Sequence, residues 1–427
     1  MEVMVLFGVF LLLLVLGLPI AFALGISSLA YLLLEGISLT IVPQRMYSGI
    51  DTFVLLCIPG FVLAGNLMNV GNITEHIVRF SNAVVGHIRG GLGLANVGGS
   101  MIFGGISGTA VADAASIGSV MIPGMARSGY DKPFAAAVTA ASSTIGPIIP
   151  PSVPMIIVGS LAGVSVGRMF LAGAVPGLLL GVAMMITVYL LAVKRGYPKG
   201  RRATLRELLR EGRTAFWALL MTVIILYGII GGFFTPTEAS IVASLYALVV
   251  GMYVYKGLTW RKLPFILTDT VLTSSALLLL VGLANLFGWI LTSQQIPQTI
   301  AALIMAISDN PIVVILILNL ILLFVGAFME TIAALIILFP ALLGVATGIG
   351  MDPVHFAVMA VLNLMIGLTT PPVGVCLFVV SGIGKLQMLT VARAILPFLV
   401  CNILVLLLVA YVPAISLWLP DLLMGTR

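Results

Sequence analysis

Two Pro-Pro pairs interrupt otherwise apolar sequence, and each creates a place where an ion could bind. Pro150-Pro151 and Pro371-Pro372 stand 221 residues apart. The same spacing separates three further pairs, Asp131 and Asp352, Gly146 and Gly367, and Pro176 and Pro397. Proline lacks a backbone donor and cannot continue a helix, so carbonyl groups near each pair lose their intrahelical partners. In a membrane such carbonyls need another binding partner, and Na⁺ is coordinated by oxygen ligands of this kind.

A segment that begins with glycine and contains polar residues precedes each Pro-Pro break, GGISGT at residues 104–109 and GAFMET at 326–331. Each segment divides an apolar stretch, which predicts a re-entrant hairpin with its tip inside the membrane. The half-helix after each break points the positive end of its dipole at this region, which suits an anion. A duplicated, broken helix is a strong sequence indication of a transport site. Hydroxyl groups that could serve as ligands are those of Ser107, Thr109, Ser142, Ser143, Thr144, Thr369 and Thr370.

Three charged residues could also take part in binding. Asp113 and Glu330 lie just beyond the two hairpin tips. Carboxylates inside a membrane are costly and often functional, so either could tune ion binding or carry a proton. The alternative is a structural hydrogen bond within the hairpin. Arg45 could contact an anionic solute or a partner protein, or it could anchor the chain at the membrane interface.

Enzymatic chemistry has little support in the sequence. Ser107 lies in a Gly-x-Ser-Gly pattern like that of intramembrane serine proteases, but no histidine stands in a context suited to a general base. The chain has no His-Glu-x-x-His zinc pattern, no Walker A sequence and no Gly-x-Gly-x-x-Gly before a helix. We expect a protein that is not an enzyme and that draws on an ion gradient or on another protein.

Composition sets the fold class. Of 427 residues, 61% are hydrophobic and only 8% are charged, which is too few charges to cover a surface in water. Solidly apolar runs exclude a porin-like barrel, whose strands alternate. Eight of the 20 Lys and Arg residues fall within 194–213, which indicates a cytoplasmic loop and not nucleic-acid binding. The chain is predicted to be an all-α polytopic membrane protein surrounded by lipid.

We expect two repeats, at residues 1–193 and 214–427, joined by a basic cytoplasmic linker at 194–213. The first repeat is predicted to contain scaffold spans at 1–69, an arm at 72–90, a hairpin at 93–125, a broken helix at 133–162 and a span at 169–193. The second is predicted to contain a scaffold at 214–287, an arm at 293–307, a hairpin at 311–345, a broken helix at 354–382 and a span at 394–418.

The repeats are predicted to be inverted. Each has five crossings plus a hairpin that returns to its own side, and an odd number of crossings reverses the orientation of the next copy. A cytoplasmic linker then puts 17 of the 20 Lys and Arg residues on the cytoplasmic side, in agreement with the positive-inside bias. Both termini are expected to be periplasmic.

Residues 104–113, 142–152 and 363–374 read GGISGTAVAD, SSTIGPIIPPS and NLMIGLTTPPVG. These runs resemble the large membrane subunit of tripartite ATP-independent periplasmic (TRAP) transporters, and the resemblance covers essentially the whole chain. It implies an elevator-type secondary transporter of a bacterial inner membrane, similar to the ion-transporter superfamily. It also implies Na⁺ as coupling ion, a periplasmic binding protein and a small four-helix membrane subunit. Because no such four-helix segment precedes the first repeat, we expect the small subunit to be a separate chain.

By the same resemblance, one Na⁺ site would join the first tip to the first break, another would join the second tip to the second break, and the solute would lie between them. The Na⁺ ligands would come from Ser107, Gly108, Ser142, Gly146, Pro150, Gly326, Thr331, Gly367 and Thr370. Solute contacts would come from Ser107, Thr109, Ser143, Ser152, Asn363 and Thr369. No organic cofactor is expected.

The predicted function is Na⁺-coupled uptake of an organic anion, a carboxylate such as sialic acid or a C4-dicarboxylate. The hairpins and broken helices would move as a body against the remaining spans. Three alternatives stay open: a stand-alone Na⁺ or H⁺ carboxylate symporter that needs no binding protein, a channel, and an intramembrane protease. Sites built from carbonyls, helix ends and hydroxyls do not choose among the anions.

Overall fold

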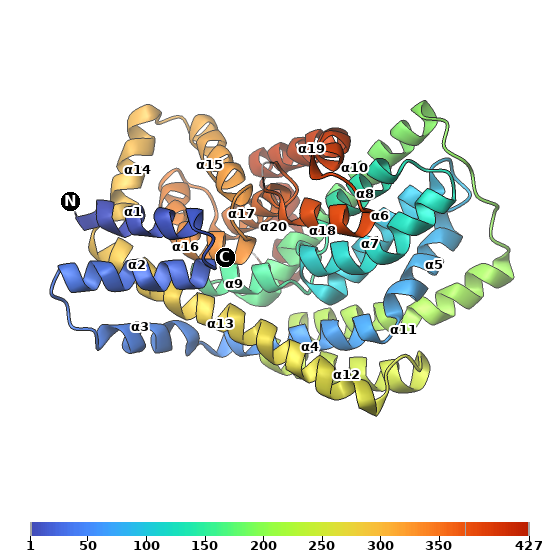
Figure 1. The fold of residues 1–427 in the computed structure, drawn as a ribbon, viewed down its shortest axis with the longest axis horizontal. Helices are drawn as coiled ribbons and strands as arrows, with labels where there is room; N and C mark the ends of the chain where they lie inside the picture. Colours follow the sequence, from blue (N-terminus) through green and yellow to red (C-terminus); the bar gives the residue numbers. More distant parts are fainter. Residues whose placement is uncertain (1, 372, 426–427) are drawn as a thin grey trace.

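The computed structural model describes residues 2–371 and 373–425, with their side chains except those of residues 2–4, 106, 107 and 301. This part of the chain is built from helices and contains no strand. Seven of the described helices are long and apolar enough to cross a membrane. The protein is therefore all-helical and polytopic, as its composition predicts (Figure 1).

The first half supplies two antiparallel helices, a scaffold helix, an arm, a hairpin, a broken helix and a long span. The helices are α1 (Glu2–Val15), α2 (Ile20–Leu34), α3 (Ile41–Ile50), α4 (Cys57–Val70), α5 (Ile73–Val85), α6 (Gly91–Ser107), α7 (Ala110–Arg127), α8 (Lys132–Ser143), α9 (Val153–Ala162) and α10 (Val166–Lys194), with a 3-10 turn at Phe53–Leu56. The half-helices α8 and α9 are too short to cross a bilayer singly, because a crossing takes roughly 20 residues.

The second half has the same order of arm, hairpin, broken helix and span, but three described α-helices precede its arm where four precede the first one. Its helices are α11 (Leu205–Ile230), α12 (Pro236–Val249), α13 (Leu263–Ser293), α14 (Ile296–Ile307), α15 (Pro311–Gly326), α16 (Thr331–Gly348), α17 (Pro353–Gly367), α18 (Val375–Gly384), α19 (Met388–Tyr411) and α20 (Ala414–Met424). The second helices of the two hairpins, α7 and α16, each have 18 residues and begin 221 residues apart.

Helix bounds differ from the expected ones at three places. Residues 43–51, inside the region predicted as scaffold spans at 1–69, lie mostly in the short helix α3 and not in a span. The second part of the expected linker belongs to α11, because a capping box starts that helix: Glu207 N donates to Thr204 Oγ1 at 3.2 Å, and Thr204 N donates to Glu207 Oε2 at 2.9 Å. The last span is divided at Val412-Pro413 into α19 and α20, since proline interrupts the helical hydrogen bonds.

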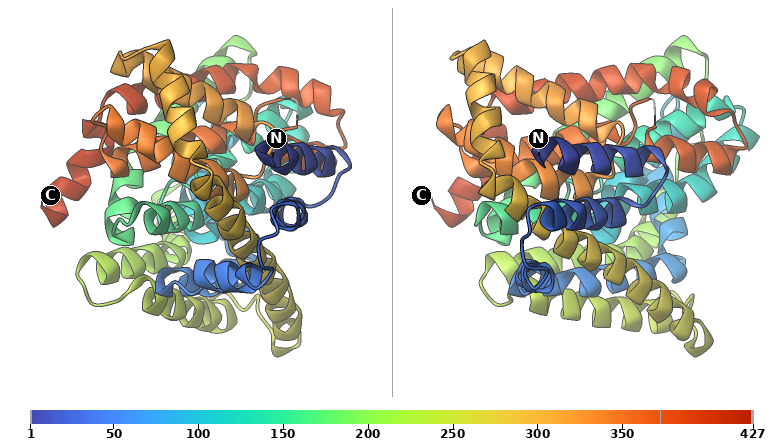
Figure 2. Two further views of the ribbon diagram at one scale, coloured as in Figure 1. Left: turned by 90° about the vertical axis from the view of Figure 1, so that its left-hand side faces the viewer. Right: turned by 60° about the vertical axis from the view of Figure 1, so that its left-hand side comes forward.

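The scaffold helices of the two halves pack in reciprocal pairs. α2 lies against α13, and α4 lies against α12. Ser244 Oγ on α12 donates to the Gly60 carbonyl on α4 at 2.7 Å, and Asn66 on α4 donates to Asp269 on α13 at 3.0 Å. Helices α3, α4, α11 and α12 form a layer below the hairpins and broken helices in Figure 2, and the gold helix α13 rises from this layer toward α14.

The two arm helices stand steeply to the bundle at opposite ends of it, with α5 on the right and α14 on the left of Figure 1. α5 is amphipathic, with Ile73, Ile77 and Ser81 among its buried positions. On it, His76 stacks on Tyr255 with ring centroids 5.1 Å apart, and burial together with the charge of Arg79 lowers the pKa of the imidazole. This arm therefore carries its polar groups at the edge of the bundle, as an interfacial helix does.

Candidate ion and solute site

The first hairpin tip contacts the first break through bare backbone. Gly104 and Gly146 approach so closely that a Cβ built on Gly104 would lie 2.1 Å from Gly146 Cα. A Cβ on Gly105 would lie 3.0 Å from the carbonyl oxygen of Pro150. Only glycine permits this approach. The tip between α6 and α7 and the break between α8 and α9 are therefore one structural unit.

The second half repeats this contact with different residues around it. A Cβ built on Gly367 would lie 2.5 Å from the carbonyl carbon of Gly326, so the second tip and second break also meet backbone to backbone. Gly374 N donates to the Ala327 carbonyl at 3.5 Å, which joins the far side of the break to the same tip. Each half thus forms one contact between a tip and a break.

Local hydrogen bonds stabilise the first break, and a left-handed glycine ends the second. In the first, Ser152 caps α9 by accepting from Met155 N at 3.2 Å, and its hydroxyl donates to the Pro147 carbonyl. In the second, Gly374 adopts a left-handed φ of +53° immediately before α18, a conformation suited to glycine. At the first tip, Gly108 has φ of +63° for the same reason.

Predicted hydroxyl ligands at both breaks donate their protons to backbone carbonyls of the preceding helical turn. Ser143 donates to the Ala140 carbonyl at 2.8 Å, while Thr369 and Thr370 both donate to the Ile366 carbonyl, at 2.8 and 2.9 Å. A hydroxyl that donates its proton keeps its lone pairs, which are what a cation uses. These oxygens are therefore still available as ligands.

Two predicted site residues carry buried oxygens without a hydrogen-bond partner in the described structure. They are Thr331 Oγ1, at the start of α16, and Asn363 Oδ1, on α17. Thr109 lies in extended backbone as the N-cap residue of α7. The side chain of Ser107, expected to serve both ion and solute, lies outside the described part of the structure, as does Pro372.

Each half also has a buried polar network that the sequence did not single out. In the first half, Ser100 and Ser142 share a hydrogen bond of 2.9 Å, and Asn96 donates to Thr139 at 2.7 Å. In the second half, Asn363 donates to Asn319 Oδ1 at 2.8 Å. Asn96, Ser100 and Asn319 are polar residues in otherwise apolar hairpin helices. A polar residue in such a helix is the sequence feature that could have indicated these networks.

The two halves cross over at the site. α9, which follows the first break, packs against α16 of the second hairpin. α18, which follows the second break, packs against α7 of the first hairpin and against α8. Each half-helix that begins at a break is therefore held by the hairpin of the other half, and the four predicted segments belong to one packed assembly.

The three charged candidates have different surroundings. Glu330 caps α16, accepting from Ile332 N at 2.9 Å and Ala333 N at 3.1 Å. The guanidinium of Arg45 lies 5.0 Å from the centre of the Trp289 ring, a cation–π contact. Asp113 is fully buried, and neither of its carboxylate oxygens has a hydrogen-bond partner in the described structure.

Comparison with known proteins decides the family. The family model described as the tripartite ATP-independent periplasmic transporter, DctM component, matches residues 7–415. The chain belongs to this family. It is 47% identical over 410 residues to the sialic acid TRAP transporter large permease protein SiaM of Vibrio cholerae, with 96% of each chain covered. It is 40% identical to the C4-dicarboxylate TRAP transporter large permease protein DctM of Pseudomonas aeruginosa, with 93% of this chain and 94% of that protein covered.

The fold of this TRAP large permease is shared with a solved transporter. The Alcanivorax borkumensis YdaH transporter superposes with a TM-score of 0.64 at 15% sequence identity, over 89% of this chain and 87% of that one. The relatives are permeases and not enzymes, so the intramembrane-protease alternative is dropped. Large permeases of this family work with a small membrane subunit and a periplasmic binding protein.

Glycine substitutions test the backbone contact between tip and break. Gly104→Ala should abolish solute uptake, because the added Cβ must push the first tip away from Gly146. Gly99→Ala on the same helix is the matched control, since its Cβ would meet side-chain atoms at 3.5 and 3.6 Å, which is ordinary contact. Uptake is measured at equal amounts of protein in the membrane. Normal uptake by Gly104→Ala would contradict the role given to this contact.

Proposed function

We propose that this large permease imports an organic anion by coupling its uptake to Na⁺. The observation that carries the proposal is the contact between tip and break, present once in each half. At both places backbone carbonyls have left regular helix while buried among apolar helices, where an unsatisfied carbonyl costs several kcal/mol. The chain carries no ATP-binding sequence pattern, so an ion gradient is the natural source of energy.

One Na⁺ would bind at each contact between tip and break. In the first half the ligands would come from Ser107, Gly108, Ser142, Gly146 and Pro150. In the second half they would come from Gly326, Thr331, Gly367 and Thr370. The unpartnered oxygen of Thr331 supports the second set, because an ion would supply its missing partner.

The solute would bind between the two contacts, near Ser107, Thr109, Ser143, Ser152, Asn363 and Thr369. The N-termini of α9 and α18 offer backbone N–H groups and positive dipole ends, which favour a carboxylate. The unpartnered Asn363 oxygen can accept a hydrogen bond from a solute hydroxyl or amide. Sialic acid and C4-dicarboxylates, named for the two relatives, both carry a carboxylate and are the first candidates.

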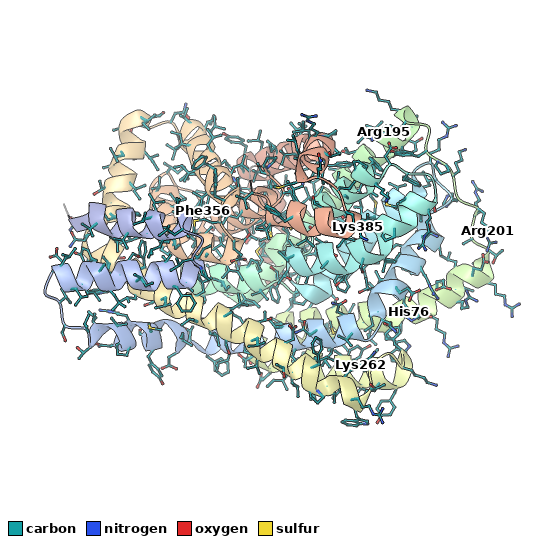
Figure 3. All side chains as sticks on the ribbon, in the orientation of Figure 1. His76, Arg195, Arg201, Lys262, Phe356 and Lys385 are labelled. Atoms are coloured by element: carbon teal, nitrogen blue, oxygen red, sulfur yellow. The ribbon has the colours of Figure 1, made fainter. Side chains whose placement is uncertain are left out.

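An inverted arrangement of residues 1–193 and 214–427 is supported by reciprocal packing. α2 pairs with α13 while α4 pairs with α12, and α9 pairs with α16 while α18 pairs with α7. The arms lie at opposite ends. The labelled Arg195, Arg201, Lys262 and Lys385 all lie right of centre in Figure 3, at the end where α5 lies, which we assign to the cytoplasm. Both termini would then be periplasmic in an inner-membrane protein.

An elevator motion is supported by the surface between scaffold and site. α1, α2 and α13 meet α9 and α16 in a cluster of aliphatic and aromatic side chains that includes Leu24, Phe287, Ile157 and Ile336. Such a surface carries few directional bonds, so one side can slide past the other without leaving buried polar groups unpaired. The moving body would contain α6–α9 and α15–α18, connected to the scaffold by the arms α5 and α14.

Na⁺-coupled uptake is tested in proteoliposomes that contain the permease and its small subunit, with a periplasmic binding protein of the same transporter added outside. An inward Na⁺ gradient should drive accumulation of labelled sialic acid or a C4-dicarboxylate, and K⁺ in place of Na⁺ should not. Uptake that persists without Na⁺ would refute the coupling. Full uptake without the binding protein would favour a stand-alone symporter, and flux far above transporter turnover would favour a channel.

Opposite orientation of the hairpins is tested with single cysteines at their open ends. Ser128, after α7, and Thr347, near the end of α16, are both exposed. In a background without Cys57, Cys376 and Cys401, a membrane-impermeant thiol reagent in whole cells should label Thr347→Cys and leave Ser128→Cys unlabelled. Broken cells should show labelling of both, as the control. Labelling of both positions from the same side would exclude inverted repeats.

A further inference from the structure

The most poorly compensated charge in the described structure is Asp113. It lies in the first turn of α7 with 0% of its surface exposed, and among the described side chains no donor reaches either carboxylate oxygen in full hydrogen-bond geometry. None of the described ion pairs involves it. A buried, ionised carboxylate without a partner is too costly to persist. Either a cation must compensate its charge or a proton must neutralise it.

The side chains that can be placed near Asp113 are small and neutral. The Ser100 hydroxyl on α6 faces the carboxylate, yet its hydrogen bond joins it to Ser142 on α8, at 2.9 Å. Cys376 lies on α18, which packs against α7. A carboxylate beside a hydroxyl oxygen, with no described ion pair to a cationic side chain, offers hard oxygen donors of the kind that a hard cation binds.

The second half has no counterpart to this charge. Counting from the start of each hairpin's second helix, Ala334 on α16 occupies the place of Asp113 on α7. The one carboxylate at the second tip, Glu330, is already satisfied by two backbone N–H groups. The buried charge is therefore a property of the first half alone, and repetition of the fold does not explain it.

We infer that Asp113 and Ser100 form a third cation site, which takes a monovalent ion of the size of Na⁺. It is adjacent to the first proposed Na⁺ site, because the Ser100 hydroxyl is hydrogen-bonded to that of Ser142, a proposed ligand of the first site. Because α18 packs against α7, which carries Asp113, the ion would sit where the first hairpin meets the half-helix that follows the second break. It would hold those two elements together as part of the moving body. The inference adds to the proposed function and rests on it for the choice of ion.

The number of bound ions tests the inference. Equilibrium binding of ²²Na⁺ is measured on the purified permease with its small subunit, for wild type, Asp113→Asn, Ser100→Ala and the control Ser119→Ala. Ser119 lies on the same helix but donates to the Ser116 carbonyl in its own chain segment. Asp113→Asn and Ser100→Ala should each bind one Na⁺ fewer per protomer than wild type, and Ser119→Ala should bind the full number.

Other results have separate meanings. Wild-type protein that binds no Na⁺ would refute the proposed coupling itself. A wild type that binds Na⁺ and an Asp113→Asn variant that binds the same number would overturn only the third site. The same number together with a lost pH dependence of uptake would mean that Asp113 carries a proton, which also overturns the cation site. If Asp113→Asn does not fold, Asp113→Ala decides, since it removes the carboxylate, leaves the Ser100–Ser142 hydrogen bond in place and gives the residue that the second half has at Ala334.

Discussion

The structure depends on a constraint set by the membrane: backbone that leaves regular helix at membrane depth must be covered by protein or used by a ligand. The chain meets it twice by laying a hairpin tip against a broken helix, glycine to glycine, at Gly104 with Gly146 and at Gly326 with Gly367. The carbonyls freed by the Pro-Pro pairs are thereby enclosed together with the tips. A site made in this way is rich in oxygen, shielded from lipid and suited to small cations.

The rest of the fold follows from enclosing these two contacts. The half-helices that leave the breaks are braced by the opposite hairpins, α9 by α16 and α18 by α7, so the two halves cannot be separated without exposing both sites. The scaffold helices pair in the same reciprocal manner, and they meet the hairpins and breaks across an apolar surface. Coupling between ion and solute would arise because both bind in one packed assembly that must move as a whole.

Sequence alone predicted the helical membrane class, the duplicated breaks and the family, because Pro-Pro pairs and the glycines at the tips act through backbone geometry that is visible in a single chain. It did not predict the networks through Asn96, Ser100 and Asn319, since which face of an apolar helix meets a break depends on packing across the fold. The sequence-based prediction also missed that residues 205–213 are helical, although Thr204 and Glu207 have the spacing of a capping box. The free oxygens of Thr331 and Asn363 could only be found from three-dimensional contacts.

The central claim, that hairpins and broken helices move as one body against the scaffold, is tested most directly by locking the two together. Ser160 at the end of α9 and Asn285 on α13 line one cavity of about 250 Å³ between the proposed moving body and the scaffold. The measurement is solute uptake by Ser160→Cys/Asn285→Cys in a background lacking Cys57, Cys376 and Cys401, before and after cross-linking with Hg²⁺. Uptake should stop on cross-linking and return on addition of excess thiol. Undiminished uptake by fully cross-linked protein would contradict the rigid-body movement.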